Sequence, residues 1–294
     1  MASEAQEQQS VGILGAASVL TNRMVPDALS PEQIEAKAEA AAVGKASMPK
    51  IKLFVLAMFA GVFVGLGAAF FTVVMGDTEM GFAAQRVLGG LCFCLGLELV
   101  LLCGAELFTG NALMVLGCAS GKVSLYGLAR NWTIVWIGNF VGSLLLAALI
   151  LGANLQGLNA GAVGDAMVSL AVGKVTPGWI TLFCRGVLCN VLVCLAVWVG
   201  FGARTSADKV LGIILPVCAF VVMGFEHCVA NMFFLPMGLA AKALGFGAAV
   251  AGADALTLGG MLFNLSAATL GNIAGGILIV GVGYWIAYGR AAKK

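Results

Sequence analysis

The sequence predicts an all-α membrane protein whose six transmembrane helices form two inverted three-helix repeats, with broken second and fifth helices. Three observations predict this class. Only 10% of the 294 residues are charged and 61% are hydrophobic, whereas soluble globular chains carry about 25% charged residues. Uncharged stretches long enough to cross a bilayer recur along the chain, and short motifs repeat at fixed offsets. With a mean hydropathy of +1.03, too few polar residues remain to cover a soluble globule.

The N-terminal segment, residues 1–50, is expected to be cytoplasmic and to contain one short helix. Ser30 is a typical N-cap, a proline follows at the first helical position, and Gln33 completes a capping box. The weakly apolar stripe after it is flanked by charges, which predicts an amphipathic helix on the membrane surface. Residues 51–290 are expected to form the six-helix channel domain, and residues 291–294 a cytoplasmic tail.

Four of the predicted spans are unbroken. Residues 53–76 carry no charge over 24 positions, which exceeds the roughly 20 residues that a spanning helix needs. The other three lie at about 131–153, 180–203 and 269–288. A further apolar piece, 255–266, precedes the last span and is expected to be a half-helix or to lie along the surface.

Two stretches are too long for one helix and are interrupted in the middle. The second span lies within about 87–121, where Glu98 and Glu106 interrupt the apolar run and a Thr-Gly pair follows. The fifth lies within 210–241, where Glu226 and His227 interrupt it. Both are therefore predicted to be broken helices.

The basic residues predict the orientation of the chain. With six spans, twelve of the sixteen Lys and Arg residues fall on the side of both termini, and four fall on the other side: Arg86, Lys174, Arg185 and Lys242. Because Lys and Arg are retained on the cytoplasmic side, both termini are expected to be cytoplasmic and the protein to lie in the cytoplasmic (inner) membrane of a cell.

An internal repeat relates the two halves. The Gly, Glu and Asn of GAELFTGN, which begins at Gly104, recur 120 residues later in GFEHCVAN from Gly224. GNFVGSLL from Gly138 matches GNIAGGIL from Gly271 at an offset of 133. Three spans per half reverse the direction of the second copy, so the halves are expected to be related by a pseudo-two-fold axis in the membrane plane.

The broken helices predict a pore lining. Their free backbone groups cannot face lipid and must face protein or a water-filled path. The N-terminus of a half-helix carries partial positive charge and free N–H donors, which suits an anion. Glu106 and Glu226 are interpreted as structural braces that accept the freed N–H groups, with direct contact to the permeating solute as the alternative.

Four further residues are candidates for function. His227 is the only histidine; ionisable groups in a membrane mark permeation paths, and imidazole titrates near neutrality, so it can lend a proton to a weak anion. A satisfied core histidine is the alternative. Thr109 supplies a hydroxyl that orients this ring, contacts the solute, or bonds to its own backbone. Lys174 is either a solvated loop lysine or a positive charge at a pore mouth, and Glu98 faces either a protomer contact or the pore.

Four motifs in order resemble the formate/nitrite transporter family, and the resemblance covers the chain from Ser30 onward. They are LCGAELFTG (102–110), GVLCNVLVCLA (186–196), GFEHCVANMFFLPMG (224–238) and TLGNIAGG (269–276). The resemblance implies homo-pentamers in a lipid bilayer, built of aquaporin-like protomers. Each protomer has its own pore for a small monovalent anion such as formate, nitrite, hydrosulfide or lactate.

The resemblance also implies roles for single residues. His227 corresponds to the central histidine, Thr109 to the loop threonine, Lys174 to the vestibule lysine and Glu226 to the bracing acid. The apolar constrictions map to Phe93, Leu97, Leu107 and Phe220, and polar residues near the path map to Asn190 and Asn272. No cofactor or metal is implied. The net charge of +2 is spread thinly along the chain, so the sequence has no basic patch of the kind that binds nucleic acid.

These assignments favour one transport chemistry. A dry constriction opposes a bare anion, whereas a neutral acid passes, so a small carboxylate must gain a proton from His227 or from water at the vestibule. Formate is the leading substrate. Nitrite, hydrosulfide and lactate stay open, because the first loop reads FTGN where formate channels often carry FTS and because Glu98 replaces a commonly aliphatic residue.

Two other classes of function fit the residues less well. A neutral-solute, aquaporin-like pore would carry paired NPA motifs at the breaks, and neither break has one. An intramembrane enzyme would need clustered carboxylates or a nucleophile beside a base, which the chain lacks. The protein is therefore not expected to be an enzyme.

Overall fold

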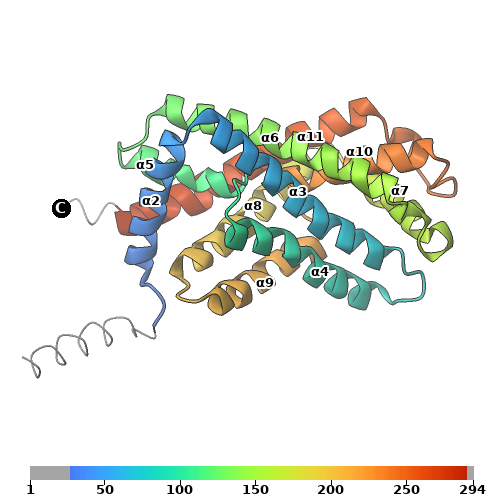
Figure 1. The fold of residues 1–294 in the computed structure, drawn as a ribbon, viewed down its shortest axis with the longest axis horizontal. Coiled ribbons are helices and arrows are strands. Elements are labelled where there is room, and N and C mark those ends of the chain that lie inside the picture. Colours follow the sequence, from blue (N-terminus) through green and yellow to red (C-terminus); the bar gives the residue numbers. More distant parts are fainter. Residues whose placement is uncertain (1–26, 290–294) are drawn as a thin grey trace, which may run out of the picture.

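The computed structural model describes residues 27–289, and the regular elements in that range are all helical (Figure 1). The helices in chain order are α2 (Pro31–Ser47), α3 (Lys50–Met75), α4 (Phe82–Cys103), α5 (Val115–Ala119), α6 (Leu125–Gly152), α7 (Ala162–Val175), α8 (Trp179–Gly202), α9 (Ser206–Val222), α10 (Cys228–Ala243), α11 (Leu258–Ala274) and α12 (Val282–Tyr284). Short 3₁₀ turns are η1 (Gly110–Met114), η2 (Leu155–Gly157), η3 (Asn159–Gly161) and η4 (Ala253–Ala255), and wider π-type turns are η5 (Gly275–Gly281) and η6 (Trp285–Gly289). Residues 1–26 of the predicted N-terminal segment and the end of the chain from 290, with Arg23, Arg290, Lys293 and Lys294, lie outside the described residues.

The six-span architecture with breaks in the second and fifth spans is confirmed. Five helices are long and apolar enough to cross a membrane: α3, α4, α6, α8 and the continuous helix Leu258–Gly289. The fifth crossing is made by α9 and α10, of 17 and 16 residues, which meet at the second break. The second crossing continues past the end of α4 into η1 and α5.

The short N-terminal helix begins where the sequence predicts. The Ser30 hydroxyl accepts a hydrogen bond from the backbone N–H of Gln33 at 3.4 Å, and the Gln33 side chain accepts one from the Ser30 N–H at 3.0 Å. This reciprocal pair satisfies two donors that a helix start otherwise leaves free.

The last span is longer than predicted. Residues 258–289 form one continuous helix of 32 residues, so the expectation that 255–266 is a separate half-helix or lies along the surface is wrong. Thr257 caps its start by accepting a hydrogen bond from the Gly260 N–H at 3.1 Å. The polar Asn264 of this piece is fully buried and hydrogen-bonds to the neighbouring elements.

A helix that the sequence did not predict, α7, precedes the fourth span. Lys174 lies in its last turn and not in a loop. Both α2 and α7 end on a Gly-Lys pair, Gly44-Lys45 and Gly173-Lys174, followed by a proline and a span. The two helices lie at opposite ends of the molecule (Figure 1). Each repeat therefore consists of one short helix and three spans.

Close helix packing depends on glycines at equivalent places in the two repeats. In the first repeat α3 packs against α4 and α6, and in the second α8 packs against α9 and α11. A Cβ on Gly142 of α6 would overlap the carbonyl oxygen of Met58, and a Cβ on Gly275 would overlap that of Val187. Small residues at these positions let the backbones approach closely, as membrane helices require.

We expect Gly142→Ala to destabilise the protein by about 1–3 kcal/mol, because the added methyl group forces α6 away from α3. Gly152→Ala on the same helix is the matched control, since nothing lies within 4 Å of a Cβ there. That control should match or exceed wild type, because Ala favours a helix over Gly. Thermal unfolding of the two purified variants in detergent measures the difference, and equal stability would contradict the packing argument.

Candidate functional site

Two breaks with the same backbone geometry interrupt the second and fifth spans. Gly104, with φ +78°, directly follows the end of α4, and Gly224, with φ +67°, lies two residues past the end of α9; glycine adopts this backbone region without strain. Beyond each glycine the chain hydrogen-bonds to a neighbouring span. The Glu106 N–H donates to Leu56 O of α3 at 3.1 Å, and the Glu226 N–H donates to Arg185 O of α8 at 3.3 Å.

A buried asparagine closes the first break. The Asn139 side-chain amide donates to Glu106 O at 2.9 Å and to Ala57 O at 2.7 Å, and its oxygen accepts from the Phe108 N–H at 2.9 Å. Two backbone groups of the broken span, the Glu106 carbonyl and the Phe108 N–H, are satisfied by this one side chain. Its third bond, to Ala57 O, ties the break to α3.

Asn272 repeats this arrangement at the second break. Its amide donates to Glu226 O and to Gly186 O, both at 2.8 Å, and its oxygen accepts from the Cys228 N–H at 2.9 Å. The sequence assigned Asn272 to the substrate path. In the structure both of its amide hydrogens are bound to backbone, so this side chain holds the break in place.

A polar cluster surrounds the acid of the first break. Glu106 accepts from Lys45 Nζ at 2.7 Å and from the Asn111 amide at 2.8 Å. The Asn111 amide also donates to the Asn131 side-chain oxygen at 2.9 Å. Sequence reasoning missed Lys45 and Asn131, because Lys45 lies on the short helix α2, outside the spans.

The second acid sits in the equivalent cluster. Glu226 accepts from the amides of Asn231 at 2.5 Å and Asn264 at 3.1 Å, and Lys174 Nζ lies 3.4 Å from both of its oxygens. The signals that would have found both clusters are the recurring Gly-Lys pair and the 133-residue offset between Asn131 and Asn264.

The two carboxylates brace the breaks differently from the expectation. Their partners in the described chain are side chains: one lysine at each break, with one asparagine amide on Glu106 and two on Glu226. The backbone groups of the breaks are instead bound by Asn139 and Asn272.

His227 joins the second break to the first. It is the N-cap of α10, where its Nδ1 accepts from the Ala230 N–H at 3.0 Å, and its Nε2 lies 3.0 Å from the Thr109 hydroxyl. Because Nδ1 is an acceptor, the ring carries its proton on Nε2, which donates to Thr109. The ring also stacks on Phe220 with centroids 5.8 Å apart. His227 and Thr109 are both buried.

Asn190 adds a further polar group at this junction. Its amide donates to Thr109 O at 3.2 Å and to Asn272 O at 2.6 Å. Its side-chain oxygen is buried and has no hydrogen-bond partner in the described part of the protein. The candidate residues Thr109, Asn190, His227 and Asn272 therefore lie together.

A small central cavity of about 10 Å³ adjoins the His227 ring. Its lining is Val64, Phe93, Leu97, Leu107, Val193, Phe220 and His227, so the four residues assigned to constrictions share one apolar space. Phe93 and Phe220 meet edge to face with centroids 5.7 Å apart. This volume holds one water molecule at most.

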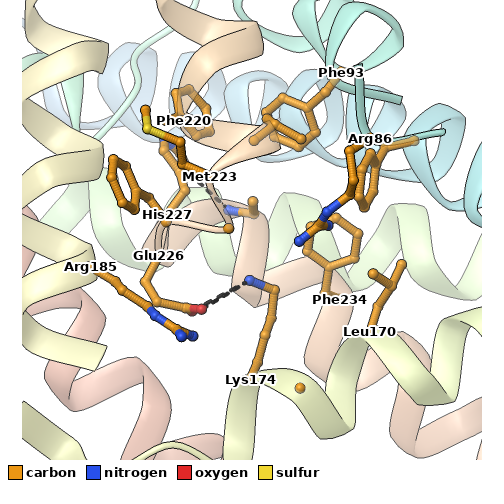
Figure 2. A pocket seen from close by; sticks show the side chains of 16 residues that line it. Arg86, Phe93, Leu170, Lys174, Arg185, Phe220, Met223, Glu226, His227 and Phe234 are labelled. Carbon is orange, nitrogen blue, oxygen red and sulfur yellow. Dashed lines mark hydrogen bonds and ion pairs between the residues drawn. The ribbon is translucent and has the colours of Figure 1, made fainter. Parts of the chain in front are cut away.

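A larger cavity lies on each side of the central one. The Lys174 cavity, about 210 Å³, contains Lys174 and Glu226 and shares Phe93, Phe220 and His227 with the central cavity (Figure 2).

The Lys45 cavity, about 470 Å³, contains Lys45, Lys52 and Glu106 and shares Leu97 and Leu107 with the central cavity. The central cavity therefore adjoins both larger cavities, which share no lining residue with each other. Glu98 is partly buried on α4 and lines none of the three.

Comparison with known proteins gives a consistent result. Residues 32–286 match the family model described as formate/nitrite transporter. The formate channel FocA of Escherichia coli (strain K12) is 40% identical over 274 residues, covering 90% of this chain and 96% of that protein. The formate channel BtFdhC of Bacillus thuringiensis is 34% identical over 260 residues, covering 88% and 95%.

Solved structures agree with these relatives. A pentameric formate channel with formate bound superposes with a TM-score of 0.75 at 41% identity, covering 81% of this chain and 97% of that one. A second structure, described as an FNT family ion channel, has the same TM-score at 32% identity and covers 86% and 98%.

Proposed function

The chain belongs to the formate/nitrite transporter family, a family of multi-pass membrane proteins, and from this premise we propose that it carries formate across the cell membrane. The anion passes as a neutral acid, with local protonation beside His227. The relatives named above are channels and not enzymes, in agreement with the expectation from the sequence.

One observation supports this proposal above the others. The imidazole of His227 is the polar member of the lining of an otherwise apolar central cavity that separates two cation-bearing cavities. An anion that enters from either side meets a space where an unpaired charge is very costly. The anion therefore has to be neutralised by a proton at the central cavity, beside the His227 imidazole.

The two outer cavities act as vestibules in this proposal. Lys174 and Lys45 each stand beside a buried glutamate at a break, 3.4 Å and 2.7 Å away. A positive charge at the mouth of a narrow path raises the local concentration of anions. The equivalent placement in both repeats supports passage in either direction.

The hydrogen bonds of His227 define its part in the proton transfer. The neutral ring offers its Nε2–H to Thr109 or to the passing anion, while Nδ1 holds the Ala230 N–H. When Nε2 gives its proton to the anion, the ring takes up a proton from the vestibule solution in the same passage and returns to its neutral form, so one proton crosses with each formate. Formate, whose acid titrates near ~4 like an Asp side chain, is a stable anion in the vestibule and a neutral acid only after this step.

The assembly and its placement follow the relatives. The solved relative is described as pentameric with formate bound, so we propose a homo-pentamer with one path per protomer. The Lys45 cavity then opens to the cytoplasm together with both termini, and the Lys174 cavity opens to the outside, as the distribution of Lys and Arg predicts.

Uptake of isotopically labelled formate into proteoliposomes tests this function. We expect uptake well above that of empty vesicles and faster at acidic external pH, because more anion pairs with a proton there. Nitrite, lactate and hydrosulfide in the same vesicles rank the substrates, and formate should rank first. Formate uptake no faster than in empty vesicles would refute the proposal, and faster nitrite than formate uptake would reassign the substrate.

A further inference from the structure

The Lys174 cavity holds more positive charge than one lysine. Its lining includes Lys174, Arg86 and Arg185 against a single carboxylate, Glu226. Lys174 is paired with Glu226 at 3.4 Å, so these two charges largely offset each other. The net charge of the cavity therefore comes from the two arginines.

Arg86, on the first turns of α4, has no carboxylate partner among the described residues. Its guanidinium carbon lies 5.8 Å from the centre of the Phe82 ring, and its Nε is buried without a hydrogen-bond partner in the described chain. One of its terminal nitrogens lies beside Gly224, at the second break. A guanidinium held this way retains donors that nothing in the described protein accepts.

Arg185 approaches the same space from α8. Its backbone carbonyl accepts the Glu226 N–H at 3.3 Å, which ties its position to the second break. No ion pair joins its side chain to the described residues, and the side chain is only partly buried. Figure 2 shows the Arg86 and Arg185 guanidinium groups entering the region around Lys174 Nζ from two different sides.

We infer that Arg86 and Arg185 form a receiving subsite in the Lys174 cavity that selects planar monoanions with two oxygen atoms, carboxylates and nitrite, over spherical monoanions. This inference rests on the proposed function and adds a specificity filter ahead of the central cavity. The filter belongs to one mouth alone, because the charged lining of the Lys45 cavity is Lys45, Lys52 and Glu106, without arginine.

The chemistry of the guanidinium group carries the selectivity. Its N–H donors form a rigid planar fork that binds a two-oxygen anion through two parallel hydrogen bonds. An ammonium group attracts the same charge but offers no fork, and a halide has one acceptor atom, so it cannot form two parallel hydrogen bonds with the guanidinium. Replacing Arg by Lys thus keeps the electrostatic attraction and removes the shape recognition.

The test separates charge from shape in proteoliposomes of zwitterionic lipid. Two quantities are measured: the half-saturating concentration of labelled formate, and the bromide concentration that halves formate uptake when formate is kept far below half-saturation. In the double variant Arg86→Lys/Arg185→Lys we expect half-saturation by formate to rise about threefold to tenfold and inhibition by bromide to stay unchanged. In Arg86→Gln/Arg185→Gln both concentrations should rise, because the charge is lost as well.

Controls make each outcome decisive. Arg204→Lys is the matched control, because Arg204 is exposed and lines none of the three cavities. It should leave both quantities at their wild-type values. An unchanged maximal rate in the lysine double variant shows that it folds. Wild-type half-saturation in that variant, or an equal rise for formate and bromide, overturns the inference while the function stands. Absence of formate uptake by the wild type overturns the function and this inference together.

Discussion

We expect the His227→Phe variant to lose most of its formate uptake, by about 10²-fold at acidic external pH, and its remaining uptake to be independent of pH. Phenylalanine keeps the stacking on Phe220 but has no group that donates to the anion. A positioned proton donor contributes typically 10²–10⁴-fold to a proton-transfer step. Initial uptake of labelled formate at a series of external pH values, corrected for empty vesicles, measures both the rate and its slope with pH.

A second variant separates proton transfer from helix capping. His227 also caps α10 through the Ala230 N–H, and loss of an N-cap costs about 1 kcal/mol. His227→Asn retains an oxygen that accepts this N–H but has no titratable group. The two variants should therefore show the same flat pH dependence, with the asparagine variant the more stable. If either variant transports formate at the wild-type rate with the wild-type slope, His227 has no part in the mechanism.

The sequence predicts those parts of the fold that depend on local pattern. A span is visible because a bilayer demands an uninterrupted apolar run, and a break is visible because an acid interrupts such a run at Glu106 and Glu226. The GN motifs reveal the repeat because Asn139 and Asn272 perform the same hydrogen bonding in each half. Residues with the same structural role in both repeats can therefore be recognised in a single sequence when their motifs recur.

Features that depend on tertiary contacts are not readable in this way. Helix α7 is too short to span a bilayer, and its apolar face is buried by packing against α10, a contact that the local sequence does not predict. Lys45 belongs to the recurring Gly-Lys pair, but its contact with Glu106 arises only when α2 folds over the first break. The convergence of Arg86 and Arg185 on one cavity joins two helices about a hundred residues apart, and no local spacing encodes that meeting.

Asn272→Leu is expected to prevent the recovery of stable protein. Leucine has a similar shape but leaves the Glu226 carbonyl and the Cys228 N–H of the break buried without partners, and it removes the bond to the Gly186 carbonyl of α8. Each group without a partner costs about 1–3 kcal/mol, and two such groups are a large part of the roughly 5–15 kcal/mol that holds a folded domain. Asn139→Leu removes the equivalent three bonds at the first break. Thermal unfolding and the yield of monodisperse protein in detergent measure both losses.

Symmetry makes this last expectation quantitative, because the same bonds are lost in each repeat and the two variants should be destabilised to a similar extent. Ser266→Leu introduces the same side chain on an exposed face of the helix that carries Asn272, so it controls for leucine in that helix. It should unfold near the wild-type temperature. If Asn272→Leu instead unfolds at the same temperature as this control, other groups or bound water satisfy the backbone of the break. In that case the paired asparagines are not what stabilises the two helix breaks within the membrane.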